Sequence, residues 1–238
     1  MKSETQKFSS GTWLLANRIC PYSQRAHLAL LNANMDFTYE SINFITKPDW
    51  FSSLTPFNAI PLVIDNGSFI YESTAIVEYI DEKHDLGWMG SNLQHRSLLR
   101  SWFVNCNKIH NELRNFFITN EEFKFNSSLM ALRNYFNNCE QHLSPDFFFI
   151  QGGEADKSLS ALGIVFAPLF VLQETLAEYS GVDFWEGAKS FQRLAQEILA
   201  LPNVGVLNSA EYKQELINFI LPTRSVFAQI AGSSKLCV

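Results

Sequence analysis

The spacing of apolar residues changes near residue 85, and this change constrains the fold more than any other feature of the sequence. Up to about His84, short apolar runs of strand length alternate with segments of helical spacing. After a glycine-containing linker at residues 85–92, the periodic segments all have helical spacing and are separated by prolines and glycines. The chain is therefore predicted to form an α/β domain over residues 1–85 and an all-helical domain over residues 93–238.

The first part has the order β-α-β-α-β-β-α. Its first two strands flank a helix, so they are expected to be parallel. Its last two strands are joined through Asn66-Gly67, a pair typical of a two-residue hairpin, so they are expected to be antiparallel. Strands are predicted at 12–16, 37–42, 61–64 and 69–71, and helices at 24–34, 47–54 and 72–84.

The second part is predicted to contain helices at about 93–118, 126–143, 159–179, 187–200 and 209–221. The breaks between them coincide with Pro145, Gly152-Gly153, Gly181, Pro202 and Pro222. This half is rich in phenylalanine, which indicates a helical core filled by large aromatic side chains.

The composition indicates a globular, acidic protein. Hydrophobic residues make up 47% of the 238 residues and charged residues 18%, which is enough apolar material for a proper core. The formal net charge of −6 argues against nucleic acid as a partner and leaves a small anionic ligand to be held by local charges. The residues before Trp13 do not form a secretory signal, and the apolar stretches look shorter than the roughly 20 residues of a membrane span. We therefore expect a cytoplasmic protein without stable membrane insertion.

The four cysteines, at positions 20, 106, 139 and 237, form neither a C-x-x-C pair nor a spacing typical of metal ligands. In a chain without a signal they are expected to be reduced, and no metal site is expected.

Cys20-Pro21-Tyr22-Ser23 lies between the first strand and the first helix. A thiol at a helix N-terminus is favoured as a thiolate by the unpaired backbone N–H groups and the helix dipole. Cys20 could equally be a small core residue, as free cysteines often are. Ser23 stands where a dithiol motif has its second cysteine, so a reactive Cys20 would need an external thiol, for which glutathione is the obvious cytosolic candidate.

Three further segments offer polar groups, each with an ordinary alternative. Ile60-Pro61 starts a strand; a cis bond there would expose the backbone of Ile60 to an extended peptide, and otherwise it is a loop proline. Ser73 could cap its own helix, or bind a carboxylate while Glu72 faces an ammonium group. Lys47 could hold an anion or be a solvated surface lysine.

Taken together, four segments resemble the cytosolic glutathione transferases, and among them the omega class and its bacterial relatives. The matching segments are CPYSQR at 20–25, KPDWF at 47–51, TPFNAIPLV at 55–63 and YESTAIVEYIDE at 71–82. The resemblance implies a thioredoxin-like N-terminal domain that binds glutathione as co-substrate. It also implies a helical domain for the second substrate and a homodimer.

The same resemblance implies roles for individual residues. Cys20 would be the catalytic residue and would form a mixed disulfide with glutathione. Tyr22, where the omega pattern usually has phenylalanine, would flank the thiol. Three contacts to glutathione complete the implied site: the Ile60 backbone beside a cis Pro61 pairs with the cysteinyl unit, Glu72 and Ser73 hold the γ-glutamyl end, and Lys47 reaches the glycyl carboxylate.

The function expected from this resemblance is that of a glutathione-dependent thiol transferase or reductase, which removes glutathione from mixed disulfides and also reduces dehydroascorbate. Two alternatives are a conjugating transferase activated by Ser23 and a non-catalytic binding protein on the same fold. Stringent-starvation-type proteins, elongation-factor subunits and chloride intracellular channel proteins are examples of such non-catalytic relatives.

Expectations for the second half are less specific. The second substrate is expected between the domains, against the first half of the helix at 93–118 and the C-terminal tail. Arg25 is expected to form a structural ion pair. The family commonly has Ser-x-x-Asp where this chain has Ser160-Ala161-Leu162-Gly163, a loss of a capping partner that typically costs about 1 kcal/mol. The pocket candidates are Trp102, Phe103, Asn105 and Asn107, for which core packing is the competing interpretation.

Overall fold

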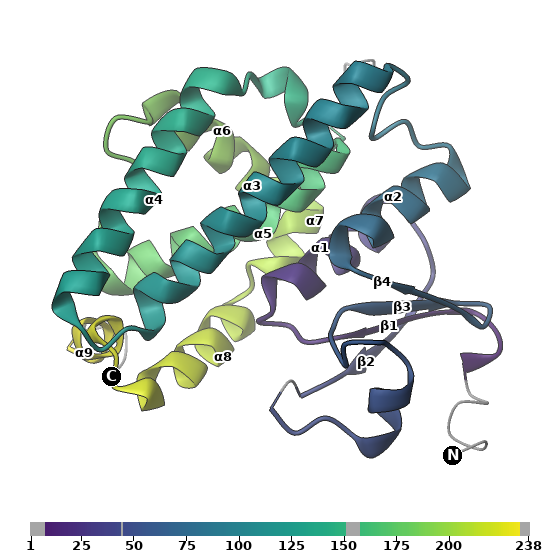
Figure 1. Ribbon diagram of the computed structural model, residues 1–238, viewed down its shortest axis with the longest axis horizontal. Helices are drawn as coiled ribbons and strands as arrows, with labels where there is room; N and C mark the ends of the chain where they lie inside the picture. Colours follow the sequence, from purple (N-terminus) through teal and green to yellow (C-terminus); the bar gives the residue numbers. More distant parts are fainter. Residues whose placement is uncertain (1–7, 44, 151–157, 234–238) are drawn as a thin grey trace.

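A computed structural model describes residues 8–43, 45–150 and 158–233. The predicted break at Gly152-Gly153 and Cys237 lie outside these residues. Figure 1 shows a small sheet at one end of the molecule and a bundle of helices at the other, with α1 and α2 between them. The elements of the first part are β1 (Thr12–Ala16), α1 (Pro21–Asn32), β2 (Thr38–Ser41), η2 (Asp49–Ser53), β3 (Leu62–Asp65), β4 (Ser68–Tyr71) and α2 (Ser73–His84).

The sheet has the strand order β2-β1-β3-β4. β1 pairs with β2 in parallel and β3 pairs with β4 in antiparallel fashion, as predicted, and the structure adds the antiparallel pairing of β1 with β3. The β3–β4 turn contains Asn66 with φ 48° and Gly67 with φ 83°, and two consecutive positive φ angles are what a type I′ hairpin turn requires. The predicted mixed sheet and its hairpin are therefore confirmed.

The two faces of the sheet pack against different layers. Leu14 and Ala16 of β1 belong to the large core beneath α1 and α2, whereas Leu15 points to the other face, where it meets Phe8 and Phe51. This alternation follows from the two-residue period of a strand. The large core continues from α1 and α2 into the helical half, so a single hydrophobic interior supports both parts.

The short helix predicted at 47–54 is present, but it is of the 3₁₀ type and begins after Pro48. The segment forms the short 3₁₀ helix η2, with Pro48 in an extended conformation (ψ 145°) before it. The five residues of η2 fit the short pieces in which 3₁₀ helices are used, although most are no longer than about three to four residues. Burial of Phe51 against the sheet holds this turn in place.

The helical half contains two short α-helices that the sequence did not predict, α7 and α9. The predicted break at Pro202 is confirmed: α6 ends at Leu199, and Pro202 is the first residue of α7 (Pro202–Leu207), a position that tolerates its missing N–H. Two 3₁₀ turns, η3 (Pro145–Phe147) and η4 (Leu221–Thr223), accompany the helices. The α-helices of this half in the described ranges are α3 (Leu93–Ile118), α4 (Glu122–His142), α5 (Ala161–Ser180), α6 (Lys189–Leu199), α7 (Pro202–Leu207), α8 (Ala210–Ile220) and α9 (Val226–Gly232).

Helix α5 is the central helix of this half (Figure 1). It is long and apolar enough to cross a membrane by length and composition, with a mean hydropathy of 1.4, so the expectation that every apolar stretch is too short is wrong. However, 83% of this stretch is buried inside the protein, as in the core helix of a soluble fold.

The segment at 85–92 is a packed connection. Both oxygens of the Asp81 carboxylate accept backbone hydrogen bonds, from Trp88 N at 2.8 Å and from Met89 N at 2.9 Å. The side chains of Trp88 and Met89 are buried in the large core. The end of α2 is therefore tied directly to the start of the helical half.

Close packing at the start of α5 explains the departure at Gly163. Ser160 caps the helix by accepting a hydrogen bond from Gly163 N at 3.2 Å. A Cβ atom at position 163 would lie 2.3 Å from the carbonyl oxygen of Phe148 and 2.8 Å from the Leu159 side chain. An aspartate therefore does not fit at position 163. The glycine is there because the Phe148 carbonyl lies too close for a side chain, and the missing capping carboxylate is a consequence of this packing.

We predict that Gly163→Ala destabilises the protein by about 1–3 kcal/mol, because the added methyl group overpacks a backbone contact that cannot yield. Gly205→Ala is the matched control: position 205 is also helical, and no atom lies within 4 Å of its ideal Cβ. The control should be neutral or stabilising, since alanine favours a helix by up to about 1 kcal/mol. Urea unfolding of both variants checks this, and equal stabilities would contradict the packing argument.

A second prediction concerns Asp65, which is buried at the end of β3. It accepts hydrogen bonds from Tyr79 at 2.5 Å and Thr12 at 3.2 Å, and it pairs with Lys83, so it ties the hairpin to α2. Burial acts to raise the pKa of Asp65, but the bonds from Lys83, Tyr79 and Thr12 together hold this pKa below its ordinary value.

A carboxyl group with a lowered pKa in the folded state stabilises the fold above its unfolded pKa, and this contribution is lost as the pH falls through the folded pKa. Asp65→Asn should therefore be less stable than the parent at pH 7, and the difference should shrink below about pH 4. Urea midpoints measured from pH 7 to pH 3 test this. A difference that does not depend on pH would show that the carboxylate charge is not responsible.

Candidate functional site

Cys20 occupies the N-cap position of α1. Its backbone is extended (φ −83°, ψ 116°), Pro21 follows as the first helical residue, and the helix start has no side-chain capping bond. The thiol is free and half-buried. The sequence therefore predicted the position of Cys20 at a helix start correctly.

The thiol borders a small, mainly apolar cavity of about 210 Å³, which we call the Cys20 pocket. Its walls come from the start of α1, from the second half of α3 at His110, Asn111, Arg114 and Phe117, and from α5 and α8. The part of α3 that borders the thiol is thus its second half, whereas the second substrate was expected against the first half of this helix. Phe103 is core, and neither Trp102 nor Asn105 lines this pocket.

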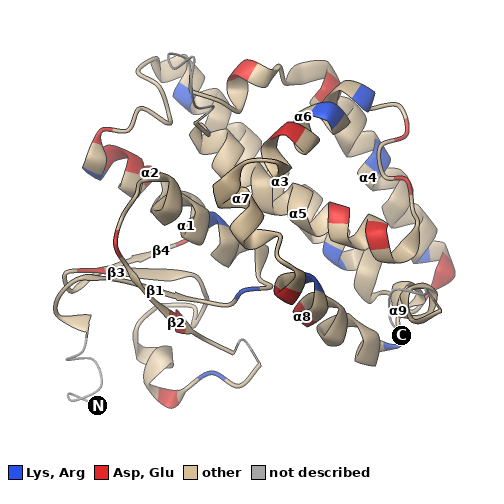
Figure 2. Cartoon of the chain, turned by 180° about the vertical axis from the view of Figure 1, so that it is seen from behind, with Lys and Arg blue, Asp and Glu red and all other residues tan. Residues whose placement is uncertain are grey.

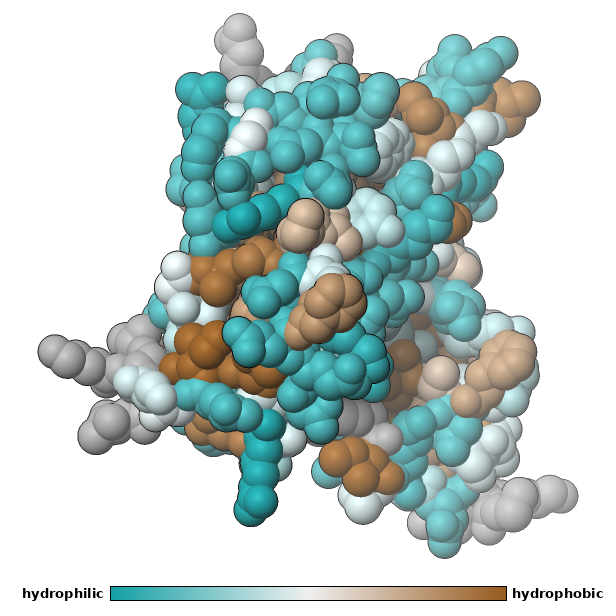
Figure 3. Space-filling view, turned by 60° about the vertical axis from the view of Figure 1, so that its left-hand side comes forward, coloured by the Kyte–Doolittle hydropathy of each residue, from teal (hydrophilic) through white to brown (hydrophobic). Residues whose placement is uncertain are grey.

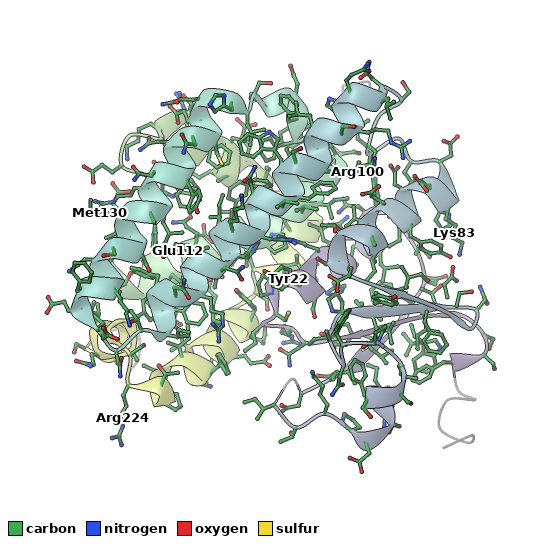
Figure 4. All side chains as sticks on the ribbon, viewed as in Figure 1. Tyr22, Lys83, Arg100, Glu112, Met130 and Arg224 are labelled. Atoms are coloured by element: carbon green, nitrogen blue, oxygen red, sulfur yellow. The ribbon has the colours of Figure 1, made fainter. Side chains whose placement is uncertain are left out.

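A second cavity of about 350 Å³, the Ser73 pocket, adjoins the first. It is lined by Ile60 and Pro61 before β3, by Glu72 and Ser73 where β4 passes into α2, and by Asn107 on α3. Tyr22 and Asn111 line both pockets, and the Tyr22 hydroxyl lies 3.4 Å from Asn111 Oδ1. Tyr22 lies at the centre of the molecule in Figure 4, where the start of α1 faces α3.

The N-terminus of α2 opens into the Ser73 pocket. Glu72 is its N-cap residue, with a left-handed φ of 68° that is unusual outside glycine, and its side chain makes no capping bond. Ser73 is the first helical residue, so the interpretation of Ser73 as the helix cap is wrong. The free N–H groups of the first turn make this end suited to an anion.

The other predicted glutathione residues lie around the same pocket. The Ile60–Pro61 peptide bond is cis, and both residues line the cavity. Lys47 does not line it; its ammonium group donates a hydrogen bond to the carbonyl of Asn58. Because Phe57 and Ala59 on either side of Asn58 do line the pocket, Lys47 lies at its rim.

Sequence reasoning missed the role of Arg25, which is fully buried between the two pockets. Five polar groups lie within hydrogen-bond distance of its guanidinium nitrogens, and in the described part of the chain none of them is acidic. The expected ion pair of Arg25 is therefore wrong. These groups are Val165 O at 3.0 Å, Ser73 Oγ at 3.4 Å, Asn107 Oδ1 at 2.6 Å, Cys106 Sγ at 3.3 Å and the ring nitrogen Nδ1 of His110 at 3.0 Å.

These bonds orient the groups that face the Ser73 pocket. A guanidinium group can only donate, so Ser73 Oγ and Asn107 Oδ1 must accept from it. The Ser73 hydroxyl hydrogen and the Asn107 amide hydrogens are thereby left to donate elsewhere. The guanidinium carbon of Arg25 also lies 4.9 Å from the centre of the Tyr22 ring. Burial raises the pKa of Tyr22, and the positive charge of Arg25 partly offsets this increase.

The other described cysteines differ from Cys20 in their surroundings. Cys106 and Cys139 are buried. Burial raises the pKa of the Cys106 thiol to about 11 and raises that of Cys139 further, so both are protonated at neutral pH. Ser23, the rival hydroxyl, is also buried; it accepts a hydrogen bond from Asn17 N at 3.2 Å and lines neither pocket.

Comparison with known families gives one matching model, "Glutathione S-transferase, N-terminal domain", over residues 19–83. A "Probable glutathione transferase" of Aplysia californica is 37% identical over 65 residues, which are 27% of this chain and 71% of that protein. "Glutathione S-transferase omega-2" of Mus musculus is 40% identical over 67 residues, which are 27% of each chain. The match to this omega-class relative thus spans only about a quarter of its length.

The likeness of the whole fold extends further. The crystal structure of the tau class glutathione S-transferase of Mangifera indica superposes with a TM-score of 0.76 at 23% identity, covering 89% of this chain and 99% of that one. At this identity the superposition shows the fold: a thioredoxin-like α/β part with a four-stranded mixed sheet, followed by a mostly helical part. Together with the match to the Aplysia protein, it shows that the chain belongs to the glutathione transferase family.

Proposed function

We propose that the protein is a glutathione-dependent thiol transferase that works through a mixed disulfide between Cys20 and glutathione. The proposal depends mainly on one observation: the Cys20 pocket and the Ser73 pocket share a wall. Cys20 borders the apolar pocket, the α2 N-terminus opens into the polar pocket, and Tyr22 and Asn111 line both. A glutathione sulfur at this shared wall would be next to the thiol, with its peptide in one pocket and its disulfide partner in the other.

The Ser73 pocket offers complementary groups to each part of glutathione. The γ-glutamyl carboxylate would take the Ser73 hydroxyl and the free N–H groups of α2, and the exposed Glu72 carboxylate would face the ammonium group. The backbone of Ile60 would pair with the cysteinyl unit as an added strand would. Lys47, at the rim, would reach the glycyl carboxylate.

Buried positive charge supports an anionic ligand in this pocket. Arg25 has uncharged partners, and two of them, Ser73 and Asn107, line the pocket. In a low-dielectric interior such an unpaired charge attracts an anion at short range. An acidic protein can thus bind an acidic tripeptide through local charge, although Lys and Arg are interspersed with Asp and Glu over the outer helices (Figure 2).

The reaction would have two exchange steps. The Cys20 thiolate attacks the glutathione sulfur of a mixed disulfide; a bond forms between Cys20 and glutathione, and the partner leaves as a thiolate that takes up a proton. A second glutathione thiolate then attacks the glutathione sulfur bound to Cys20, which releases glutathione disulfide and restores the Cys20 thiolate. Dehydroascorbate reduction would use the same cysteine.

The alternatives are less well supported. A conjugating mechanism that uses Ser23 would need this hydroxyl in the site, whereas Ser23 is buried outside both pockets. A purely non-catalytic role gives no reason for a half-exposed thiol at the N-terminus of α1 beside a ligand-sized pocket.

We also propose that the protein is a cytoplasmic homodimer. Support for a dimer comes from the family and from exposed apolar side chains, among them Phe57 before β3 and Leu93, Leu98 and Val104 on α3. On the face seen in Figure 3, by contrast, apolar residues form separate patches in a hydrophilic surface. Free thiols at Cys20, Cys106 and Cys139 fit a reducing compartment.

Cys20→Ser should abolish the glutathione adduct that oxidised glutathione forms with the parent protein. It should also lower thiol transferase activity on the order of a hundred-fold or more, because the attacking nucleophile is removed. Intact mass spectrometry and a coupled assay with a glutathione mixed disulfide measure the two effects. Ser23→Ala is the control and should keep both the adduct and the activity. Activity retained in Cys20→Ser, or lost only in Ser23→Ala, would show that the proposed mechanism is wrong.

Arg25→Met should weaken glutathione binding on the order of ten-fold or more, because the buried charge that attracts the anion and orients Ser73 and Asn107 is lost. Arg100→Met is the matched control, because Arg100 forms an exposed ion pair with Glu78 and is expected to leave binding unchanged. Titration calorimetry on protein shown to be folded by circular dichroism separates affinity from stability. Equal affinities of the two variants would contradict a role for the Arg25 charge.

A further inference from the structure

The Cys20 pocket has one permanently charged residue in its described wall. This residue is Arg114, which lies on the same face of α3 as Asn111 and Phe117, and all three line the pocket. Among the described residues of the wall, none is an aspartate, a glutamate or a lysine. His110 also lines the pocket, but burial lowers its pKa well below the ordinary value, so its ring is neutral at physiological pH. Arg114 therefore determines the sign of the charge at this pocket.

The side chain of Arg114 has no partner within the described part of the chain. It is solvent-exposed and forms neither an ion pair nor a hydrogen bond there. Two other arginines of the same helix differ in this respect, because Arg96 pairs with Glu82 and Arg100 pairs with Glu78. The guanidinium group of Arg114 thus keeps its N–H donors and its charge available to an anion at the edge of the pocket.

Two further features make the surroundings of the pocket positive. Helix α1 begins at this wall, with Cys20 as its N-cap residue and Pro21 as its first helical residue, and the dipole of a helix places partial positive charge at its N-terminus. The guanidinium carbon of Arg25 lies 4.9 Å from the centre of the Tyr22 ring, which forms part of the wall. Arg25 has no acidic partner in the described chain. An anion in the pocket would therefore be attracted by three sources of positive charge.

The rest of the wall determines what accompanies the anion. Phe117, Leu172 and Leu216 are buried apolar residues, and the cavity they help to line has a volume of about 210 Å³. Sites for drug-sized ligands have volumes of about 300–1,000 Å³, so this pocket suits a short apolar group. Because Arg114 is exposed, a carboxylate that pairs with it would keep part of its hydration, which lowers the cost of binding a charge there.

We propose that Arg114 determines specificity for the second substrate by binding an anionic group, such as a carboxylate, at the end of a short apolar chain on the leaving sulfur. This inference rests on the proposed function, which places the reacting disulfide beside Cys20. In the first exchange step the Cys20 thiolate forms a bond to the glutathione sulfur, and the partner leaves as a thiolate that takes up a proton. Arg114 takes no part in this exchange and acts by binding the partner.

Two mixed disulfides of glutathione test the proposal, one with 3-mercaptopropionate and one with 3-mercaptopropanamide. The two partners have the same number of heavy atoms and nearly the same shape, and they differ in charge. The ratio of their kcat/KM values in the parent protein is compared with the ratio in Arg114→Gln, so that differences in intrinsic reactivity cancel. We expect Arg114→Gln to lower the relative preference for the carboxylate roughly two- to five-fold, the effect of one partly exposed ion pair. An unchanged ratio would overturn the proposal.

Two control variants and the salt concentration separate the local charge from other effects. Arg114→Lys keeps the charge and should retain most of the preference for the carboxylate. Arg193→Gln removes the same charge from an exposed side chain of α6 that lines neither pocket, so it should leave the ratio unchanged. Added salt should lower the preference of the parent but not that of Arg114→Gln, because salt screens exposed charges. A loss in Arg193→Gln or Arg114→Lys equal to that in Arg114→Gln would contradict the proposal.

A binding measurement independent of activity completes the test. S-(3-carboxypropyl)glutathione and S-(3-carbamoylpropyl)glutathione carry the same two end groups, with a methylene group in place of the leaving sulfur, so no exchange occurs. In titration calorimetry, Arg114→Gln should lower the affinity for the carboxylate relative to the amide roughly two- to five-fold. If it does so while the parent protein has no transferase activity, the proposed function fails and the anion site stands. If the parent is active and the relative affinity is unchanged, the proposed function stands and the anion site is refuted.

Discussion

The guanidinium group of Arg25 lies where α1, α2, α3 and α5 meet, and the polar groups of the site depend on it. It has five N–H donors, and none of its partners in the described chain is acidic; Ser73 and Asn107 accept from it, and so does the Val165 carbonyl. Since a donor-only group forces these two side chains to accept, the Ser73 hydroxyl hydrogen and the Asn107 amide hydrogens are left to donate elsewhere. One buried charge thereby prepares the Ser73 pocket for a ligand that accepts hydrogen bonds.

The two pockets divide the chemistry between polar and apolar surroundings. The Ser73 pocket combines a helix N-terminus, a strained backbone at Glu72 and a rim lysine, all suited to a charged peptide. The Cys20 pocket is mainly apolar and has the thiol at one side. Tyr22 and Asn111 belong to both, so a disulfide that bridges the pockets would present its sulfur atoms at Cys20.

Much of the first part could be predicted because its signals are local. The Asn66-Gly67 turn, the parallel β1–β2 pair and the position of Cys20 at a helix start all follow from neighbouring residues. The 3₁₀ turn at η2 and the short helices α7 and α9 could not be predicted this way. Segments of five to seven residues have too little intrinsic preference of their own, and tertiary packing determines their conformation.

The sequence by itself determined the order of elements in the first part and the motifs that carry the resemblance, because each depends on residues close together in the chain. Only the tertiary structure decided the rest. Arg25 has no carboxylate partner because residues up to 140 positions away surround it. Gly163 is required because the Phe148 carbonyl approaches it, and the second half of α3 borders the thiol because of how the helices pack. Such contacts join distant segments, and no local pattern records them.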